Sequence, residues 1–183
     1  MKLAADEIAP TILTTGHSTR TLDKFLKLLD RFEIELLVDV RTVPRSRHGP
    51  HFNGDSLARV LREHGIGYSH LKLLGGLRKP LIDSSNLGWR NLSFRGFADY
   101  MQTEEFGQGL KFLLELRAEK KSVLMCAEAV PWRCHRSLIS DALLARGIEA
   151  RHIISEKSFQ LHELTPFAVV ESNRVTYPEI RGG

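Results

Sequence analysis

The stretch Leu124–Arg136 holds both cysteines of the chain within a few residues of other reactive groups. It runs LMCAEAVPWRCHR, which places Cys126 and Cys134 near Glu128, His135 and two arginines. Thiols, a carboxylate, an imidazole and guanidinium groups at this spacing permit three kinds of chemistry. They are the binding of a metal ion, nucleophilic attack by a thiolate, and the binding of an anion.

A metal site would use Cys126, Cys134 and His135, which are all accepted zinc ligands. However, Cys134 and His135 are neighbours at the start of a predicted helix, where consecutive side chains diverge by about 100°. The usual C-x2-C and H-x3-H spacings are absent, and a fourth ligand such as His17 or Glu128 would have to come from elsewhere. We therefore expect no metal, and we expect Cys134 to close the start of the helix.

A thiolate mechanism would use Cys126, which follows a predicted strand and precedes a helix. Nearby arginines should lower the pKa of this thiol, as in phosphatases and rhodanese-like enzymes with a C-x5-R pattern. Here the sixth residue after the cysteine is Trp132, Arg133 comes one residue late, and Pro131 lacks an N–H group. Glu128 in the same loop opposes phosphate binding. The alternative is that Cys126 is a small buried hydrophobic residue.

Binding of an anion is the interpretation that the sequence favours. His135 and Arg136 fall in the first turn of a predicted helix, where the helix dipole disfavours cations unless an anion is also bound. The planar guanidinium group suits phosphate and carboxylate. Arginines of three loops are expected to converge on this site, namely Arg20, Arg41, Arg45, Arg47 and Arg133. The alternative is a solvated basic loop with scattered salt bridges.

Two carboxylates complete the candidate catalytic groups. Asp39 and Arg41 are two residues apart in a predicted strand and so share one face, as Cys126 and Glu128 do. Asp39 or Glu128 could act in acid–base catalysis. Internal ion pairs of Asp39 with Arg41 and of Glu128 with Arg136 explain the same pattern equally well. The predicted catalytic residues are Cys126, Glu128 and Asp39, and the predicted ligand-binding residues are Gly16, His17, Ser18, Arg41, Arg45, Ser46, His135 and Arg136.

These groups must be positioned by apolar strands that alternate with amphipathic helices. We expect strands at 11–16, 35–41, 67–77, 122–128 and 149–155, and helices at 21–32, 56–64, 94–101, 104–120 and 134–146. Thr21 is the expected N-cap of the first helix and Gly147 the expected end of the last. The alternation predicts an α/β, three-layer Rossmann-like domain with a mostly parallel sheet. Its ligands should bind beyond the carboxyl ends of the strands.

The length of 183 residues predicts a single α/β domain, with a core at about 11–156 and a C-terminal extension at 157–183. The tail FAVVESNRVTY predicts a hairpin or edge strand, and the double glycine Gly75–Gly76 a tight turn or a close backbone approach. The start MKLAADEIAPT lacks the apolar stretch of a signal peptide, and no apolar run approaches the about 20 residues that cross a bilayer. We therefore expect a cytoplasmic protein without a membrane partner.

Several motifs together resemble the family known as domain of unknown function 488. They are GHS at Gly16–Ser18, DVRTVPRS at Asp39–Ser46, LGG at Leu74–Gly76 and CAE…CHR at Cys126–Arg136, and the tail HELTPFAVVESNRVTYPE is also similar. The similarity runs from about residue 11 to residue 178. It implies a compact α/β domain and supplies neither a reaction nor a cofactor.

The sequence thus predicts an enzyme-like domain with an arginine-rich pocket for a phosphate-bearing ligand. It would be a hydrolase or transferase acting on a nucleotide or nucleic-acid component, with an anionic small molecule or nucleotide as its partner. The net charge of +4 permits such a partner. A G-x-G-x-x-G fingerprint is absent, and we expect no cofactor. The alternatives are a non-catalytic nucleic-acid or nucleotide binding module, and a thiol- or metal-based sensor.

Overall fold

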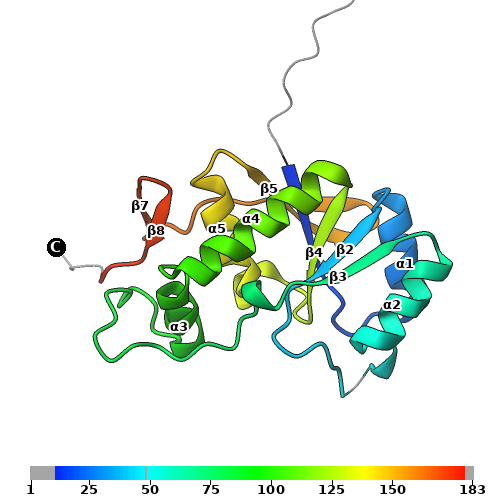
Figure 1. Ribbon diagram of the computed structural model, residues 1–183, viewed down its shortest axis with the longest axis horizontal. Helices are drawn as coiled ribbons and strands as arrows, with labels where there is room; N and C mark the ends of the chain where they lie inside the picture. Colours follow the sequence, from blue (N-terminus) through cyan, green and yellow to red (C-terminus); the bar gives the residue numbers. More distant parts are fainter. Residues whose placement is uncertain (1–10, 48, 180–183) are drawn as a thin grey trace, which may run out of the picture.

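The computed structural model describes residues 11–47 and 49–179, and a six-stranded sheet forms its centre. The strand order is β3-β2-β4-β1-β5-β6 (Figure 1). The strands are β1 (Thr11–Gly16), β2 (Leu36–Asp39), β3 (Gly67–His70), β4 (Ser122–Cys126), β5 (Glu149–Ser155) and β6 (Ser158–Leu161). All pair in parallel except β6, which is antiparallel to β5. The predicted α/β class with a mostly parallel sheet is confirmed.

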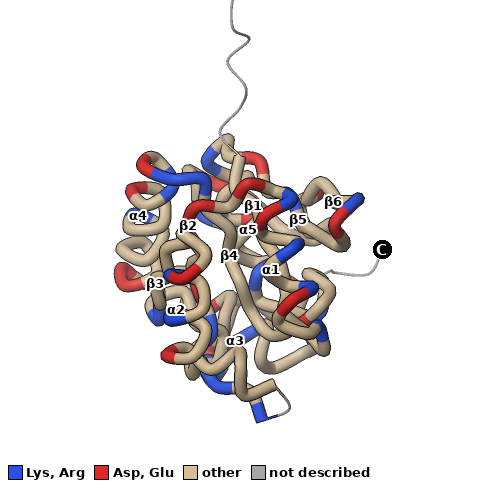
Figure 2. Tube along the Cα trace, turned by 90° about the vertical axis from the view of Figure 1, so that its right-hand side faces the viewer, with Lys and Arg blue, Asp and Glu red and all other residues tan. Residues whose placement is uncertain are grey.

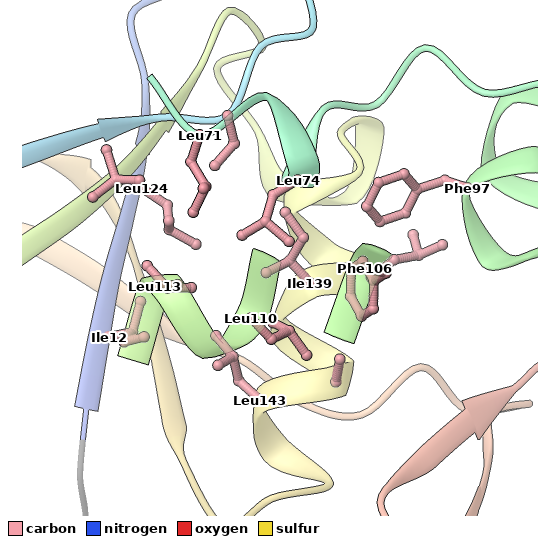
Figure 3. Packing of buried hydrophobic residues seen from close by; sticks show 14 of the residues in the cluster. Ile12, Leu71, Leu74, Phe97, Phe106, Leu110, Leu113, Leu124, Ile139 and Leu143 are labelled. Atoms are coloured by element: carbon pink, nitrogen blue, oxygen red, sulfur yellow. The ribbon is translucent and has the colours of Figure 1, made fainter. Parts of the chain in front are cut away.

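The described residues contain five helices. They are α1 (Leu22–Arg31), α2 (Gly54–Glu63), α3 (Leu92–Tyr100), α4 (Glu104–Glu119) and α5 (Arg136–Leu144). Four of them cover the two faces of this sheet and complete the three layers, while α3 packs against α5 (Figure 1). Strand side chains alternate between two cores. Leu37 and Val123 pack with α1 and α2, whereas Leu124 packs with α4 and α5 through residues such as Leu110 and Ile139 (Figure 3).

Local signals in the sequence mark the helix ends correctly. The side chain of Thr21 caps α1 by accepting a hydrogen bond from the N–H of Lys24, and Gly147 after α5 has φ +74°, the left-handed region that favours glycine. The third strand is shorter than predicted, because β3 ends at His70 and the short 3₁₀ turn Lys72–Leu74 follows. That turn buries Leu74 completely, which the strand pattern alone did not indicate.

The predicted close approach at the double glycine is confirmed. A Cβ atom on Gly75 would lie 2.6 Å from Oγ1 of Thr42, and one on Gly76 would lie 2.4 Å from Nδ1 of His135. Neither glycine has a positive φ, so the requirement is space and not an unusual backbone conformation. Gly76 thus lets the His135 ring pack directly on the backbone.

The predicted C-terminal hairpin is also confirmed. It consists of β7 (Val169–Glu171) and β8 (Arg174–Thr176), joined through Ser172 and Asn173 at positive φ, as a type I′ turn requires. After β8, Tyr177 is fully buried in the same core as α3, α4 and α5. The extension therefore completes the core.

Two further observations concern the distribution of charged residues and the length of the helices. Figure 2 shows basic and acidic residues interspersed along the helices in that view. Among the residues that the structure describes, no helix is long and apolar enough to cross a bilayer. The N-terminal stretch in which we expect no signal peptide falls, apart from its last residue, outside the described ranges.

Candidate functional site

A cavity of about 380 Å³ opens beyond the carboxyl ends of β2 and β4. The sheet order places β4 between β1 and β2, so the loops that follow these strands meet, as expected at a switch point in an open α/β sheet. The charged and thiol-bearing residues of the lining are Arg41, Arg45, Cys126, Glu128, Arg133, Cys134 and His135. Leu77 and Asn91 contribute from the loop that precedes α3.

The cavity brings together part of the predicted site. Of the candidate residues, Cys126, Glu128, Arg41, Arg45 and His135 line it, whereas Asp39, Gly16, His17, Ser18, Ser46 and Arg136 do not. Of the arginines expected to converge, Arg41, Arg45 and Arg133 are among the residues that line this cavity. Arg47 is exposed in the same loop but away from the cavity lining, and Arg20 donates to the carbonyl oxygens of Gly16 and Ile154.

Asp39 and Arg41 form a buried ion pair, which matches their predicted shared face. Nε and Nη2 of Arg41 donate to the two carboxylate oxygens of Asp39, and Nη2 also donates to the carbonyl oxygen of Phe52 at 2.8 Å. Burial alone would lower the pKa of Arg41, but the Asp39 carboxylate outweighs it and raises this pKa above its ordinary value. Tyr68 donates to Asp39 at 2.8 Å, and burial together with Asp39 raises the pKa of Tyr68.

The segment Gly16–Ser18 holds the loop after β4 in place. The N–H groups of His17 and Ser18 donate to the carbonyl oxygens of Cys126 and Ala127 at 3.0 and 2.8 Å. Gly16 is so close to this loop that a Cβ atom there would lie 1.6 Å from the carbonyl oxygen of Glu128. These contacts give the segment a backbone-positioning function that the sequence pattern did not reveal.

His17 and Ser46 make internal contacts outside the cavity lining. The His17 ring stacks on Phe52 with ring centroids 4.3 Å apart, and burial lowers the pKa of His17 to about 4. Oγ of Ser46 accepts a hydrogen bond from the N–H of Gly49, and the N–H of Ser46 donates to Oδ1 of Asn53. Ser46 thereby shapes the basic loop between β2 and α2.

The two cysteines and His135 form a compact cluster at the edge of the cavity. Sγ of Cys126, Sγ of Cys134 and a ring nitrogen of His135 all lie within 4.8 Å of one another, and Sγ of Cys134 is 3.7 Å from Nδ1 of His135. The prediction that neighbouring Cys134 and His135 diverge on a helix is wrong. Cys134 is extended (φ −134°, ψ 143°) and α5 begins only at Arg136, so both side chains turn toward Cys126.

The electrostatics of the two thiols are the reverse of the sequence-based expectation. The hydrogen bond from the Cys126 thiol is the main cause that lowers the pKa of Cys134, and His135 and Arg136 lower it further. The same hydrogen bond, together with burial, raises the pKa of Cys126. Arg136 lowers the pKa of Cys126, as expected of a nearby arginine, but the hydrogen bond with Cys134 and burial outweigh it, so the net change is upward.

Arg136 is only 1% exposed and is fully engaged within the protein. Its Nε donates to Sγ of Cys134 at 3.3 Å, its Nη1 to Oγ1 of Thr14 at 3.2 Å, and its Nη2 to the backbone carbonyl of Glu128 at 2.6 Å. The side chain thus binds the backbone of Glu128 and orients the Cys134 sulfur.

A buried chain of hydrogen bonds extends from Arg136 to the end of the protein. Thr14 Oγ1 contacts Nδ1 of His152 at 2.7 Å, Nε2 of His152 contacts Nδ1 of His162 at 2.9 Å, and Nε2 of His162 contacts Oδ1 of Asp141 at 2.9 Å. The carboxylate of Asp141 also accepts from Thr165 and Tyr177. A guanidinium only donates and a carboxylate only accepts, so when both imidazoles are neutral Nε2 of His162 donates to Asp141, Nε2 of His152 donates to His162, and Thr14 donates to Nδ1 of His152.

Comparison with known proteins gives a match to one family model. The model described as "Domain of unknown function DUF488" matches residues 21–143, which is more than half of the 183-residue chain. Neither the curated proteins nor the solved structures contain a significant match.

Proposed function

This chain belongs to the domain of unknown function 488 family, and we propose that it binds a phosphate-bearing ligand and acts on it as a hydrolase or group transferase. One observation carries the proposal. Arg41, Arg45 and Arg133 line a cavity of about 380 Å³, and Glu128, Cys126 and Cys134 line it as well. This volume is within the usual range for small-molecule sites, and guanidinium groups match phosphate oxygens well.

The three arginines differ in how firmly they are held. Arg41 is fixed by Asp39, so its guanidinium is ordered before a ligand arrives. Its Nη1 makes one long contact of 3.5 Å, with Nε2 of His17, and is the guanidinium nitrogen with the weakest internal bond, which leaves it available to donate to a ligand. Arg45 and Arg133 are exposed at the cavity and supply the remaining positive charge, because Asp39 neutralises Arg41.

The carboxylates have separate functions in this proposal. Glu128 lines the cavity and is exposed, which suits a group that takes a proton from a nucleophile or gives one to a leaving oxygen. Asp39 is completely buried and both of its oxygens accept bonds from neighbouring side chains. We therefore assign Asp39 the positioning of Arg41, and acid–base catalysis to Glu128.

Ligand binding and turnover are tested with the purified protein. Isothermal titration with phosphate, nucleoside mono- and diphosphates and sugar phosphates should identify a ligand whose affinity falls at least about tenfold in Arg45→Ala/Arg133→Ala, since charge-assisted hydrogen bonds are lost. The control is Arg47→Ala, which removes an exposed arginine of the same loop that does not line the cavity. Equal affinity in the double variant and the wild type would refute the site.

Catalysis is tested separately from binding. The ligands that bind are incubated with the protein and with Glu128→Gln, and products are followed by phosphorus NMR. Turnover that Glu128→Gln slows by about 100-fold or more is expected for a general acid–base residue. Binding without turnover would favour the alternative, a non-catalytic nucleotide or nucleic-acid binding module that uses the same arginines.

A further inference from the structure

We propose that Cys126, Cys134 and His135 bind a zinc ion whose fourth coordination position opens into the cavity. The proposal rests on the geometry of these three side chains, which helix periodicity did not predict to come together. It deepens the proposed function, because it names the group that would activate water there, but the metal site can be tested without any activity.

The distances between the ligand atoms suit a tetrahedral zinc ion. With Zn–S of about 2.3 Å and Zn–N of about 2.0–2.1 Å, tetrahedral angles place two sulfurs about 3.8 Å apart and a sulfur and a nitrogen about 3.6 Å apart. Sγ of Cys134 and Nδ1 of His135 are 3.7 Å apart, and all three ligand atoms lie within 4.8 Å of one another. At most about 1 Å of side-chain movement therefore closes the site on the metal.

The hydrogen bond of the His135 ring leaves the correct nitrogen free for a metal. Nε2 lies 3.0 Å from the carbonyl oxygen of Val40, which can only accept, so Nε2 carries the proton in the neutral ring. Nδ1 then presents its lone pair to Cys134. A ligating histidine typically donates its other N–H to a carboxylate or a backbone carbonyl in this way. The space for the ring exists because position 76 is glycine.

The loop that carries all three ligands is held rigid before any metal binds. Nη2 of Arg136 bonds the carbonyl oxygen of Glu128 at 2.6 Å, and the N–H groups of His17 and Ser18 bond the carbonyls of Cys126 and Ala127. Nε of Arg136 also donates to Sγ of Cys134 at 3.3 Å. Hydrogen bonds of this kind orient a sulfur ligand and limit the cost of ordering the site.

Three protein ligands and one open position are characteristic of catalytic zinc, whereas structural zinc sites use four protein ligands. Cys126, Cys134 and His135 line the same cavity as Glu128 and the arginines. A water molecule on zinc would transfer a proton to Glu128, and the resulting hydroxide would form a P–O bond with the phosphate-bearing ligand. The bond to the leaving oxygen then breaks, and that oxygen takes the proton back from Glu128.

Metal binding is measured on the full chain, purified with a reductant and without chelators. Elemental analysis after dialysis against zinc should give about one zinc per chain. Substitution with Co²⁺ should give sulfur-to-cobalt charge-transfer bands and the visible bands of a tetrahedral site. His135→Gln should weaken zinc binding by more than about tenfold, since even changes to groups around a zinc ligand cost 10–100-fold. The control is His64→Gln, the same change at an exposed histidine outside the cluster.

The outcomes separate this inference from the proposed function. Wild-type protein without stoichiometric zinc, or a Co²⁺ spectrum without thiolate bands, would overturn the metal site even if phosphate ligands bind as expected. Rapid formation of a Cys126–Cys134 disulfide that zinc does not prevent would also overturn it in favour of a redox pair. Stoichiometric zinc with unchanged ligand binding in the Arg45→Ala/Arg133→Ala variant would retain the metal site and refute the anion pocket.

Discussion

The buried His152 should make the protein sensitive to mild acid, and the structure gives the size of the effect. His152 is 2% exposed and lies between Thr14 and His162 in the hydrogen-bonded chain. Burial is the largest cause that lowers its pKa from 6.5 to about 3; His162 and Arg136 lower it as well, and Cys134 and Asp141 oppose this change. The folded protein therefore keeps His152 neutral where the unfolded chain protonates it.

The sign and magnitude of this change in unfolding free energy with pH follow from proton linkage. Because the folded pKa is below the unfolded one, this contribution to stability is complete above about pH 6.5 and is lost as the pH falls from there toward about 3. Each pH unit in this interval costs about 1.4 kcal/mol, so His152 alone removes about 2 kcal/mol of unfolding free energy at about pH 5. His17, whose pKa is lowered to about 4 mainly by burial, adds a similar loss.

The assay compares urea unfolding at about pH 7.5 and at about pH 5 for the wild type and for His152→Gln. Glutamine retains a side-chain N–H donor for His162 but has no proton to gain, so the variant should lose about 2 kcal/mol less than the wild type on acidification. Contributions from groups that do not interact with His152 cancel in this difference. His64→Gln, at an exposed position, should behave as the wild type. Equal losses in His152→Gln and the wild type would refute the argument that His152 is buried in its neutral form.

Three further predictions concern packing, the buried carboxylate and nucleic acid. Gly76→Ala should cost about 1–3 kcal/mol of unfolding free energy, because the added methyl group would collide with the imidazole of His135. Gly107→Ala in the open part of α4 should instead gain about 0.4–1 kcal/mol. Equal changes of the urea unfolding free energy in the two variants would contradict this. Asp141→Asn should cost about 2–4 kcal/mol in the same assay, because a buried acceptor of three side chains is lost, and a change below about 1 kcal/mol would count against it. If the cavity arginines bind nucleic acid, fluorescence anisotropy should show affinity that falls steeply with salt and that Arg45→Ala weakens more than Arg47→Ala; no binding at low salt would exclude this alternative.

Much of the fold follows from local sequence patterns. Thr21 and Gly147 have conformational preferences that do not depend on the rest of the chain, and they mark helix ends as predicted. The alternation of strands and helices gives the parallel sheet, and the carboxyl ends of the strands give the position of the cavity. Arg41, Arg45 and Cys126 could therefore be assigned to one region before the structure was known.

The thiol cluster could not be predicted in the same way. Its geometry depends on the short turn Pro131–Arg133 and on the extended conformation of Cys134, and helix periodicity contains no information on either. The chain from Thr14 to Asp141 is also invisible in the sequence, because Thr14 and His152 are 138 positions apart. Nothing in the spacing of His152 indicates its partners, because tertiary packing sets them.

The candidate site depends on parts of the chain outside the region that the family model matches. That region is 21–143, whereas β1 lies before it and the strands β5, β6, β7 and β8 lie after it. The guanidinium of Arg136 contacts the Cys134 sulfur at one end and Thr14 at the other, and a buried cation must have such partners to be tolerated. Thr14 is in turn connected through two imidazole rings to Asp141. The carboxylate of Asp141 also accepts a hydrogen bond from Tyr177 of the C-terminal extension. Since each link fixes the orientation of the next, the sulfur at the cavity is positioned by the last described segment of the chain as well as by its own loop. The extension is therefore connected by hydrogen bonds to a residue that lines the cavity.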